Sequence, residues 1–310
     1  MGDLVKTIGI IGLSEGNGHP FSYSSIINGY SGEGLADSGW PGIYSYVRRR
    51  HASEFGLDGW KVTHAWTQYP ESTKKLCAAC RISNGVEDYH EFLGQVDAVI
   101  IARDDYQTHF EISKPFLEAG MPVFIDKPLS VDLPELRHYK PYLEKGQLMS
   151  CSGMRYAREL DEPRAELGAY GRIKLMRGSI VLNWENYGIH LLDAIFGMTA
   201  AHPISVQMFS GAHDSALIRL DDGVTVQIDA LGDCARTFHV DIFGTERTGA
   251  FDIFDNFSMF RRMLWQFLES IRTGEPAIPA ERTLETMRVL IAGRIAKKEK
   301  REVFLNELPL

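Results

Sequence analysis

The stretch "PVFIDKPLSVD", residues 122–132, ends a short apolar run on a lysine, Lys127, that Pro128 follows directly. An ammonium group at the carboxyl end of a parallel strand would lie where open α/β sheets bind their ligands. There it could polarise a substrate oxygen and stabilise the negative charge that develops on it. Strands also end at the protein surface, where lysines are common, so the lysine alone does not distinguish a catalytic site from a solvated strand end.

A second group of polar residues lies in "NYGIHLLD", residues 186–193. His190 and Asp193 are three positions apart, so a helix would bring their side chains to one face. The imidazole can take a proton from a hydroxyl group, and a carboxylate beside it would hold the ring and favour the imidazolium. A hydrogen-bonded core histidine is the alternative. Asn186 can hydrogen-bond a hydroxyl group of a ligand, and Tyr187 can serve as an acid or simply pack.

A glycine-rich segment, "GIIGLSEGNGHP" at residues 9–20, follows the first apolar run. Glycines at such a place let backbone N–H groups approach a pyrophosphate, which the N-terminus of the next helix also attracts. The spacing departs from G-x-G-x-x-G, so a plain glycine-rich turn is the alternative. The residues that we expect to contact a dinucleotide here are Gly12, Ser14, Gly16, Asn17, Gly18 and His19.

The second expected strand, residues 60–66, ends at Thr67-Gln68 and has no acidic residue there. An acid at this point usually accepts hydrogen bonds from the ribose hydroxyls of NAD. A neutral end removes the repulsion of a 2′-phosphate, so NADP becomes admissible, although no arginine stands directly there to favour it. We therefore expect NAD or NADP as the cofactor, with Thr67 close to its ribose.

The elements that position these residues change character near the middle of the chain. Up to residue 150, short apolar runs alternate with helical patterns, which is typical of βαβ units and a parallel sheet. Later segments are rich in strands joined by tight turns, which favours an antiparallel sheet. We expect an α/β protein with a doubly wound Rossmann-like domain over residues 1–150 and an α+β domain with a large, mainly antiparallel open sheet over 151–280. A C-terminal helix and tail over 281–310 would pack back on the N-terminal domain.

Composition excludes several classes of function. The chain has 310 residues, 41 acidic against 33 basic, and a net charge of -8, which argues against a general nucleic-acid or anionic-membrane binder. We read the basic runs at 47–51 and 296–302 as solvated helix faces. Four cysteines form no disulfide framework, "CAAC" at 77–80 has no partner pair for a metal, and the start shows no signal peptide, so we expect a cytoplasmic protein without a metal.

The stretch "VDAVIIARDDYQTHFEISKPFLEAGMPVFIDKPLS", residues 96–130, resembles the glucose-fructose oxidoreductase / inositol dehydrogenase / MocA (Gfo/Idh/MocA) oxidoreductase family. In that family a strand ending in Glu-Lys-Pro supplies an active-site lysine. The resemblance also implies a turn like Thr-Pro-Asn-x-x-His after the preceding strand. Here that turn reads "ARDDYQTHF", with His109 at the histidine position and Arg103, Asp104 and Asp105 replacing the other residues. The cofactor contacts implied in this stretch are Arg103, Asp104, His109, Asp126 and Lys127.

The resemblance extends to "NYGIHLLD", which is similar to the family's Asp-x-Gly-x-His-x-x-Asp signature. His190 falls on the catalytic histidine and Asp193 on the following acid, whereas Asn186 replaces an acid and cannot relay a proton. Residues 29–51 have no counterpart in short family members and could form a lid, an oligomer contact or part of a sugar pocket.

The resemblance implies an NAD(P)-dependent oxidoreductase acting on a secondary hydroxyl of a sugar, nucleotide sugar or cyclic polyol. A silent cofactor-binding regulatory protein and an enzyme that oxidises its substrate only transiently, for elimination or hydrolysis, are the alternatives. We expect a small carbohydrate partner, no nucleic acid, no membrane, and a homo-oligomer, dimer or tetramer, formed through the C-terminal sheet.

Overall fold

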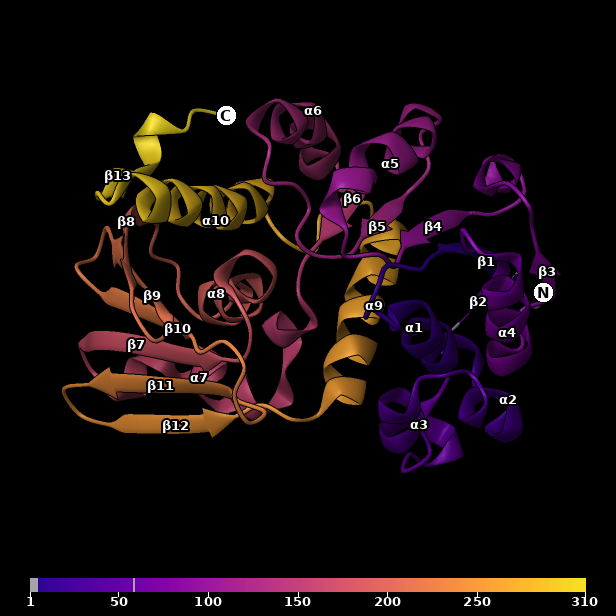
Figure 1. Ribbon diagram of the computed structural model, residues 1–310, viewed down its shortest axis with the longest axis horizontal. Helices are drawn as coiled ribbons and strands as arrows, with labels where there is room; N and C mark the ends of the chain where they lie inside the picture. The colour runs from indigo at the N-terminus through magenta and orange to yellow at the C-terminus, as the bar shows by residue number, and fades with distance from the viewer. Residues whose placement is uncertain (1–4, 58) are drawn as a thin grey trace. The chain divides into compact units, whose positions relative to one another are not determined.

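The computed structural model describes residues 5–57 and 59–310 (Figure 1). Its contacts divide the chain into two compact units. The first unit contains the chain up to Leu129, together with Pro141–Ser150 and Phe260–Ala277. The second unit contains Ser130–Lys140, Cys151–Met259 and Ile278–Leu310.

The first unit is built on a six-stranded sheet in the order β3-β2-β1-β4-β5-β6, in which every pair of neighbours is parallel. This is the Rossmann order, and it reverses direction between β1 and β4. Strands with both faces covered are apolar throughout, and β4 is fully buried. The strands are β1 (Lys6–Ile11), β2 (Trp60–Trp66), β3 (Asn84–Gly85), β4 (Ala98–Ile101), β5 (Val123–Ile125) and β6 (Leu148–Ser150).

Helices cover both faces of this sheet, with α1 and α4 on one side and α5 on the other (Figure 1). Proline stands in the first turn of α1, α3 and α4, where its missing N–H costs nothing. From Phe260 onward α9 also belongs to this unit, and its Phe267 packs on Phe124 of β5 with ring centroids 5.7 Å apart. The helices are α1 (His19–Asn28), α2 (Gly32–Ala36), α3 (Pro41–Val47), α4 (Pro70–Cys80), α5 (His109–Glu118) and α9 (Asn256–Thr273), and α6 (Leu133–Glu144) has residues in both units.

The extra segment 29–51 folds into α2 and α3 and lies on α1 and α4. A Cβ added to Gly18, just before α1, would lie 2.5 Å from the Trp40 ring and 2.6 Å from Ile43. A Cβ added to Gly34 of α2 would lie 3.1 Å from Ala79 of α4. The segment therefore packs tightly against the end of the glycine-rich loop.

The second unit is built on a seven-stranded sheet in the order β12-β11-β7-β10-β9-β8-β13. Only the β7–β10 pair is parallel among the described pairs, so the expected, mainly antiparallel sheet is confirmed. The strands are β7 (Ile173–Ile180), β8 (Pro203–Ser210), β9 (Asp214–Leu220), β10 (Thr225–Ala230), β11 (Phe238–Gly244), β12 (Thr248–Asp252) and β13 (Val303–Phe304).

Two helices, α8 (Ile189–Phe196) and α10 (Ala280–Glu299), cover one face of this sheet (Figure 1). We expected residues 281–310 to pack on the N-terminal domain, but α10 packs on β8 and α8 within the second unit. The reason is a fully buried Trp184, whose Nε1–H donates to the Leu290 carbonyl at 3.2 Å and whose ring fills the space over Gly293. The domain boundaries at residues 150 and 280 stay a prediction.

Among the described residues, no helix combines the length and the apolar character that crossing a membrane requires.

Candidate functional site

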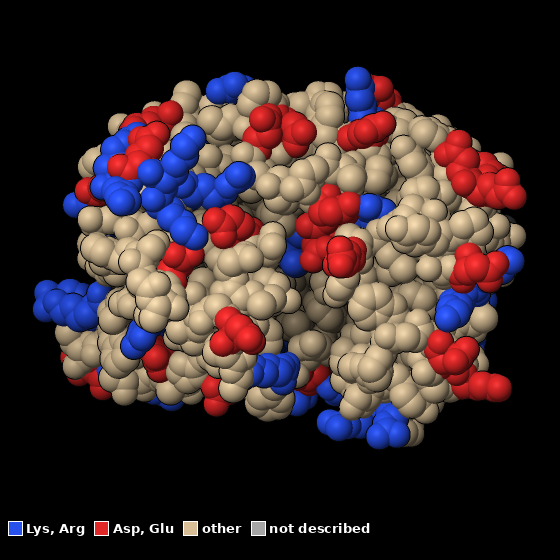
Figure 2. All heavy atoms as spheres, viewed as in Figure 1, with Lys and Arg blue, Asp and Glu red and all other residues tan. Residues whose placement is uncertain are grey.

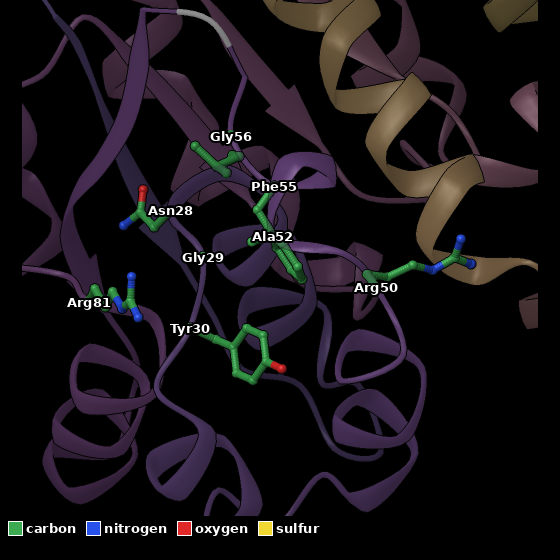
Figure 3. A pocket seen from close by; sticks show the side chains of 9 residues that line it. Asn28, Gly29, Tyr30, Arg50, Ala52, Phe55, Gly56 and Arg81 are labelled. Carbon is green, nitrogen blue, oxygen red and sulfur yellow. The ribbon is translucent and has the colours of Figure 1, made fainter.

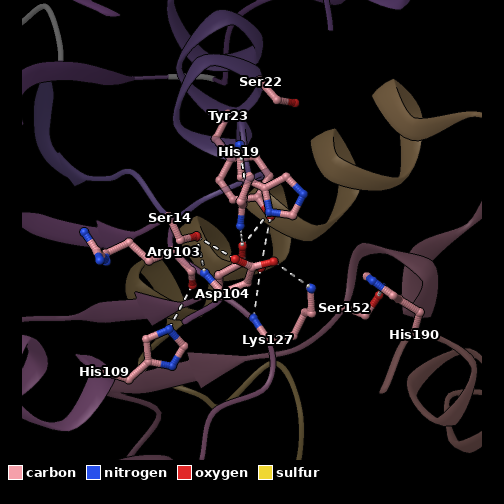
Figure 4. Close-up of polar contacts among 12 residues, drawn as sticks. Ser14, His19, Ser22, Tyr23, Arg103, Asp104, His109, Lys127, Ser152 and His190 are labelled. Carbon is pink, nitrogen blue, oxygen red and sulfur yellow. Dashed lines mark hydrogen bonds and ion pairs between the residues drawn. The ribbon is translucent and has the colours of Figure 1, made fainter. Parts of the chain in front are cut away.

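The loops after β1 and β4 meet at the carboxyl edge of the first sheet, where the strand order reverses (Figure 4). The Ser14 hydroxyl donates to a carboxylate oxygen of Asp104 at 2.5 Å. The Asp104 N–H in turn donates to the Ser14 hydroxyl oxygen at 3.1 Å. In open α/β sheets this switch point is the ligand-binding edge.

Lys127 lies at the same edge, two residues beyond β5, and is only 4% exposed. Its Nζ donates to the second carboxylate oxygen of Asp104 at 3.4 Å. A buried ammonium needs a charged or hydrogen-bonding partner, because burial removes its hydration. The explanation of Lys127 as a solvated strand end is therefore wrong.

Asp126 is buried beside Lys127 and accepts hydrogen bonds from several groups. They come from the Lys127 backbone N–H at 2.9 Å, the Asn17 side chain at 3.1 Å and the Tyr23 hydroxyl at 3.4 Å, and the His19 imidazole pairs with it. Burial alone would raise the pKa of Asp126, but His19 and Lys127 outweigh it and hold that pKa well below its usual range. The carboxylate is therefore ionised at neutral pH.

The glycine-rich loop offers space for a ligand but few backbone donors. A Cβ on Gly12 would lie 2.2 Å from the Pro20 ring. Position 12 therefore needs a glycine, because the loop packs closely on α1. Gly16 has φ +74° and open space around it, so its backbone is accessible to a ligand. At the start of α1 the His19 N–H already donates to the Asn17 side-chain oxygen at 2.7 Å, and Pro20 has no N–H. Helix N–H groups that usually bind a pyrophosphate are thus scarce here.

Two cationic side chains and one histidine of the first unit lie near this edge, and each is paired with a carboxylate: Lys127 with Asp104, Arg103 with Asp105, and His19 with Asp126. A dinucleotide fits this edge because the edge is the switch point of the sheet, because the backbone of the loop is open at Gly16, and because Lys127 and Arg103 carry positive charge. It would have to compete with the carboxylates for them. The usual acceptor of ribose hydroxyls at the end of β2 is missing, as the sequence indicated.

Two expected cofactor contacts are engaged inside the protein. The Thr67 hydroxyl is buried against the Tyr69 carbonyl at 2.8 Å and the Thr73 hydroxyl at 2.9 Å. His109 is fully buried, with its ring nitrogens 2.8 Å from the Arg103 carbonyl oxygen and 3.1 Å from that of Leu129, and burial lowers its pKa. His109 therefore ties the loop after β4 to the loop after β5 and does not face a ligand, contrary to our expectation.

His190 of α8 has a partner that the sequence did not reveal. Its Nδ1 lies 2.6 Å from the Ser152 hydroxyl oxygen (Figure 4). The Ser152 backbone N–H donates to the Asp193 carboxylate at 2.6 Å, and the Ser152 hydroxyl accepts from the Met154 N–H at 3.1 Å. Ser152 therefore links His190 to Asp193, and the direct contact of Asp193 with the imidazole that we expected stays a prediction. No spacing pattern signals this contact, because Ser152 and His190 are 38 positions apart.

Asp193 is buried and also pairs with Arg155 at 3.5 Å. Burial raises the pKa of Asp193 to about 6, although the Arg155 guanidinium and the Ser152 N–H lower it. A carboxyl group with such a pKa changes its charge close to neutral pH. Perturbed groups of this kind are common in functional sites.

Asn186 and Tyr187 belong to a π-helical turn, Trp184–Gly188, that leads directly into α8. Such turns occur frequently at functional sites. Asn186 is exposed, and its N–H is capped by the Asn183 side chain at 2.9 Å. The Tyr187 ring meets the His190 ring edge-on, with centroids 5.2 Å apart. Tyr187 is thus beside the histidine as expected, and its role as an acid stays a prediction.

A separate cavity of about 400 Å³ lies in the first unit at the C-terminal end of α1, away from the glycine-rich loop (Figure 3). Tyr30 and Arg50 from the ends of the extra segment line it together with Arg81. Figure 3 shows the Arg50 side chain extending away from Arg81, and Arg50 pairs with Glu54 at 3.4 Å. The two guanidinium groups do not converge on one ligand position.

Comparison with known protein families gives a match to a family described as "Oxidoreductase family, NAD-binding Rossmann fold", over residues 42–153. This range contains the loop after β4 and Lys127. No curated protein sequence matched significantly.

Solved structures share the fold of the whole chain at low sequence identity. The scyllo-inositol dehydrogenase of Lactobacillus casei has a TM-score of 0.78 and 16% identity, with 99% of this chain and 100% of that chain covered. A structure of that enzyme with bound NAD(H) and scyllo-inositol has a TM-score of 0.76, 16% identity and coverage of 97% and 99%. A myo-inositol dehydrogenase from Corynebacterium glutamicum has a TM-score of 0.76, 15% identity and coverage of 99% and 100%. The family match and the shared fold confirm the resemblance to the Gfo/Idh/MocA oxidoreductases that the sequence motifs indicated.

Proposed function

We propose that this protein is an NAD(P)-dependent oxidoreductase that transfers a hydride between a nicotinamide cofactor and a secondary hydroxyl of a sugar, nucleotide sugar or cyclic polyol. The observation that carries the proposal is the buried Lys127, which pairs with Asp104 at the switch point of the first sheet. A match of residues 42–153 to a family described as NAD-binding supports it. The inositol bound by the Lactobacillus casei neighbour supports a cyclic polyol as the first substrate to test.

The proposed roles follow from the chemistry of each residue. Lys127 stabilises negative charge on the substrate oxygen. His190 exchanges the hydroxyl proton through Nε2, because the Ser152 hydroxyl engages its Nδ1. A bound nicotinamide would supply the hydride chemistry. Asp193 acts on the histidine through Ser152, and Asn186 binds a substrate hydroxyl.

Titration of the purified protein with NADH and with NADPH, followed by tryptophan fluorescence, tests the cofactor. Oxidation of scyllo-inositol, myo-inositol and a nucleotide sugar, followed by nicotinamide absorbance, then tests the reaction. We expect binding of at least one nucleotide and turnover of at least one of these substrates. A folded protein that binds neither nucleotide would refute the proposal.

A silent nucleotide-binding protein is the second candidate, because Asn186 stands where the family signature has an acid and the cations at the switch point are paired. Such a protein would bind the nucleotide and leave every substrate unchanged. An enzyme that oxidises transiently would alter its substrate without releasing reduced cofactor, so product analysis beside absorbance separates all three functions.

We also propose that the open face of the second sheet joins copies of this chain. Phe209 of β8 and Phe243 of β11 are 48% and 38% exposed and alternate with buried residues, so they lie on the face away from α8 and α10. Light scattering tests the oligomer, and Phe243→Asp should dissociate it. A monomeric wild type would refute this association.

A further inference from the structure

A cavity of about 560 Å³ lies in the second unit beside the last turns of α10. Val131, Glu185 of the π-helical turn and residues of α10 line it. Its volume lies in the range of roughly 300–1,000 Å³ that small-molecule sites occupy. None of the roles proposed above uses this cavity.

One wall of the cavity is apolar. Ile291 and Ile295 are four positions apart on α10, so their side chains lie on one face of the helix. Ile295 and Val131 are only partly buried, and they leave apolar surface open to the cavity. Apolar surface of this kind is where the C–H face of a sugar ring can pack.

The rim of the cavity is cationic. The same side of α10 carries Arg294, Lys297 and Lys298, which all line the cavity. Figure 2 shows Lys and Arg side chains gathered over this helix. Lys297 is neutralised by Asp214 at 2.6 Å and Glu185 at 3.9 Å, and these carboxylates raise its pKa. Arg294 and Lys298 have no carboxylate partner among the described residues.

A solvated helix end explains only part of this rim. Cations in the last turn of a helix complement its dipole, which accounts for Lys298. Arg294 lies more than one turn before the end of α10, next to the partly open Ile295, where the dipole contributes little. In a chain of net charge -8, an unpaired Arg294 beside open apolar surface requires another explanation.

We propose that this cavity binds a phosphate-bearing carbohydrate. A phosphate monoester carries close to two negative charges at neutral pH, which matches the two unpaired cations. The ring would pack on Ile295 and Val131, and the Glu185 carboxylate could accept from ring hydroxyls. The site needs no hydride chemistry, so this inference does not rest on the proposed oxidoreductase function.

Calorimetric titration tests the inference on the intact protein with NADH in excess, so that the dinucleotide site does not compete. The probes are glucose 6-phosphate, inorganic phosphate and glucose. We expect glucose 6-phosphate to bind more tightly than inorganic phosphate, because only the sugar phosphate contacts the apolar wall, and glucose to bind much more weakly. The double variant Arg294→Ala, Lys298→Ala should bind glucose 6-phosphate about tenfold more weakly.

The matched control is Lys300→Ala, which removes an exposed cation near the same helix end that does not line the cavity. It should keep the wild-type affinity for glucose 6-phosphate. If the control and the double variant lose the same affinity for glucose 6-phosphate, the binding is general attraction by a basic surface and the proposed site is wrong. Equal affinities for inorganic phosphate and glucose 6-phosphate would overturn the carbohydrate part and leave a site for free phosphate. NADH affinity, measured separately, should be the same in all variants.

Discussion

Ser152→Ala tests whether His190 depends on the serine hydroxyl. The substitution removes the oxygen that lies 2.6 Å from His190 Nδ1 and leaves the backbone N–H that binds Asp193 in place. A hydrogen bond of this kind to an ionisable partner contributes about 1.5–3 kcal/mol. If that energy holds the imidazole in its reactive tautomer and orientation, turnover should fall by about 10- to 100-fold.

The same change also affects stability. The Met154 N–H loses its acceptor at the start of a short 3-10 helix, which should cost about 1 kcal/mol of unfolding free energy. KM for the substrate and affinity for NADH should change little, because Ser152 acts on the histidine and not on a ligand. Steady-state kinetics with the substrate found in the polyol panel, together with urea denaturation, separates the two effects.

Ser150→Ala is the matched control. Ser150 is also buried, only two residues away, but its hydroxyl has no hydrogen-bond partner among the described residues. Its removal should leave turnover unchanged and should not reduce stability. If Ser152→Ala retains the turnover of this control, the serine is a structural cap and our assignment of its role to His190 is wrong.

Three further changes test the charged groups. Lys127→Ala should lower turnover by about 100-fold or more, which is the effect of removing one electrostatic donor, and should hardly change NADH affinity. Near-normal turnover would show that the lysine only packs. Asp104→Asn keeps the hydrogen bond with Ser14 but removes a negative charge from the switch point. This variant should therefore bind NADH more tightly, as measured by calorimetry. The control Asp132→Asn changes an exposed carboxylate and should bind NADH as the wild type does. Because the pKa of Asp193 is raised from 3.8 to about 6, the folded state holds its proton longer than the unfolded state. Unfolding free energy should therefore fall by up to about 3 kcal/mol as pH rises from about 4 to about 6, and Asp193→Asn should remove this dependence in urea denaturation; an unchanged dependence would contradict the assignment.

The sequence predicted the features that local pattern controls. The apolar run before Asp126 and Lys127 identified a buried strand and placed both residues at its carboxyl end, where the structure has them. The change from alternating strands and helices to consecutive strands predicted the two kinds of sheet. These predictions succeed because strand pattern and turn residues act over a few positions.

Partners across long sequence separations could not be predicted. Lys127 pairs with Asp104 over 23 positions, and His190 meets Ser152 over 38. Such contacts depend on how loops and helices pack, and a serine in "SCSGMRY" carries no pattern that marks it. His109 shows the reverse case: its position suggested a ligand contact, but burial between two backbone carbonyls gives it a structural role.

The way α9 completes the first unit limits how this protein can be divided or recombined. Residues 260–277 pack with a unit whose other parts all lie before residue 151, and Arg261 donates to the Glu54 carbonyl at 2.8 Å. A fragment that ends at residue 150 would leave Phe124 without the Phe267 ring that covers it. An experiment that exchanges the first unit for that of another protein of this fold would therefore have to transfer this distant helix as well.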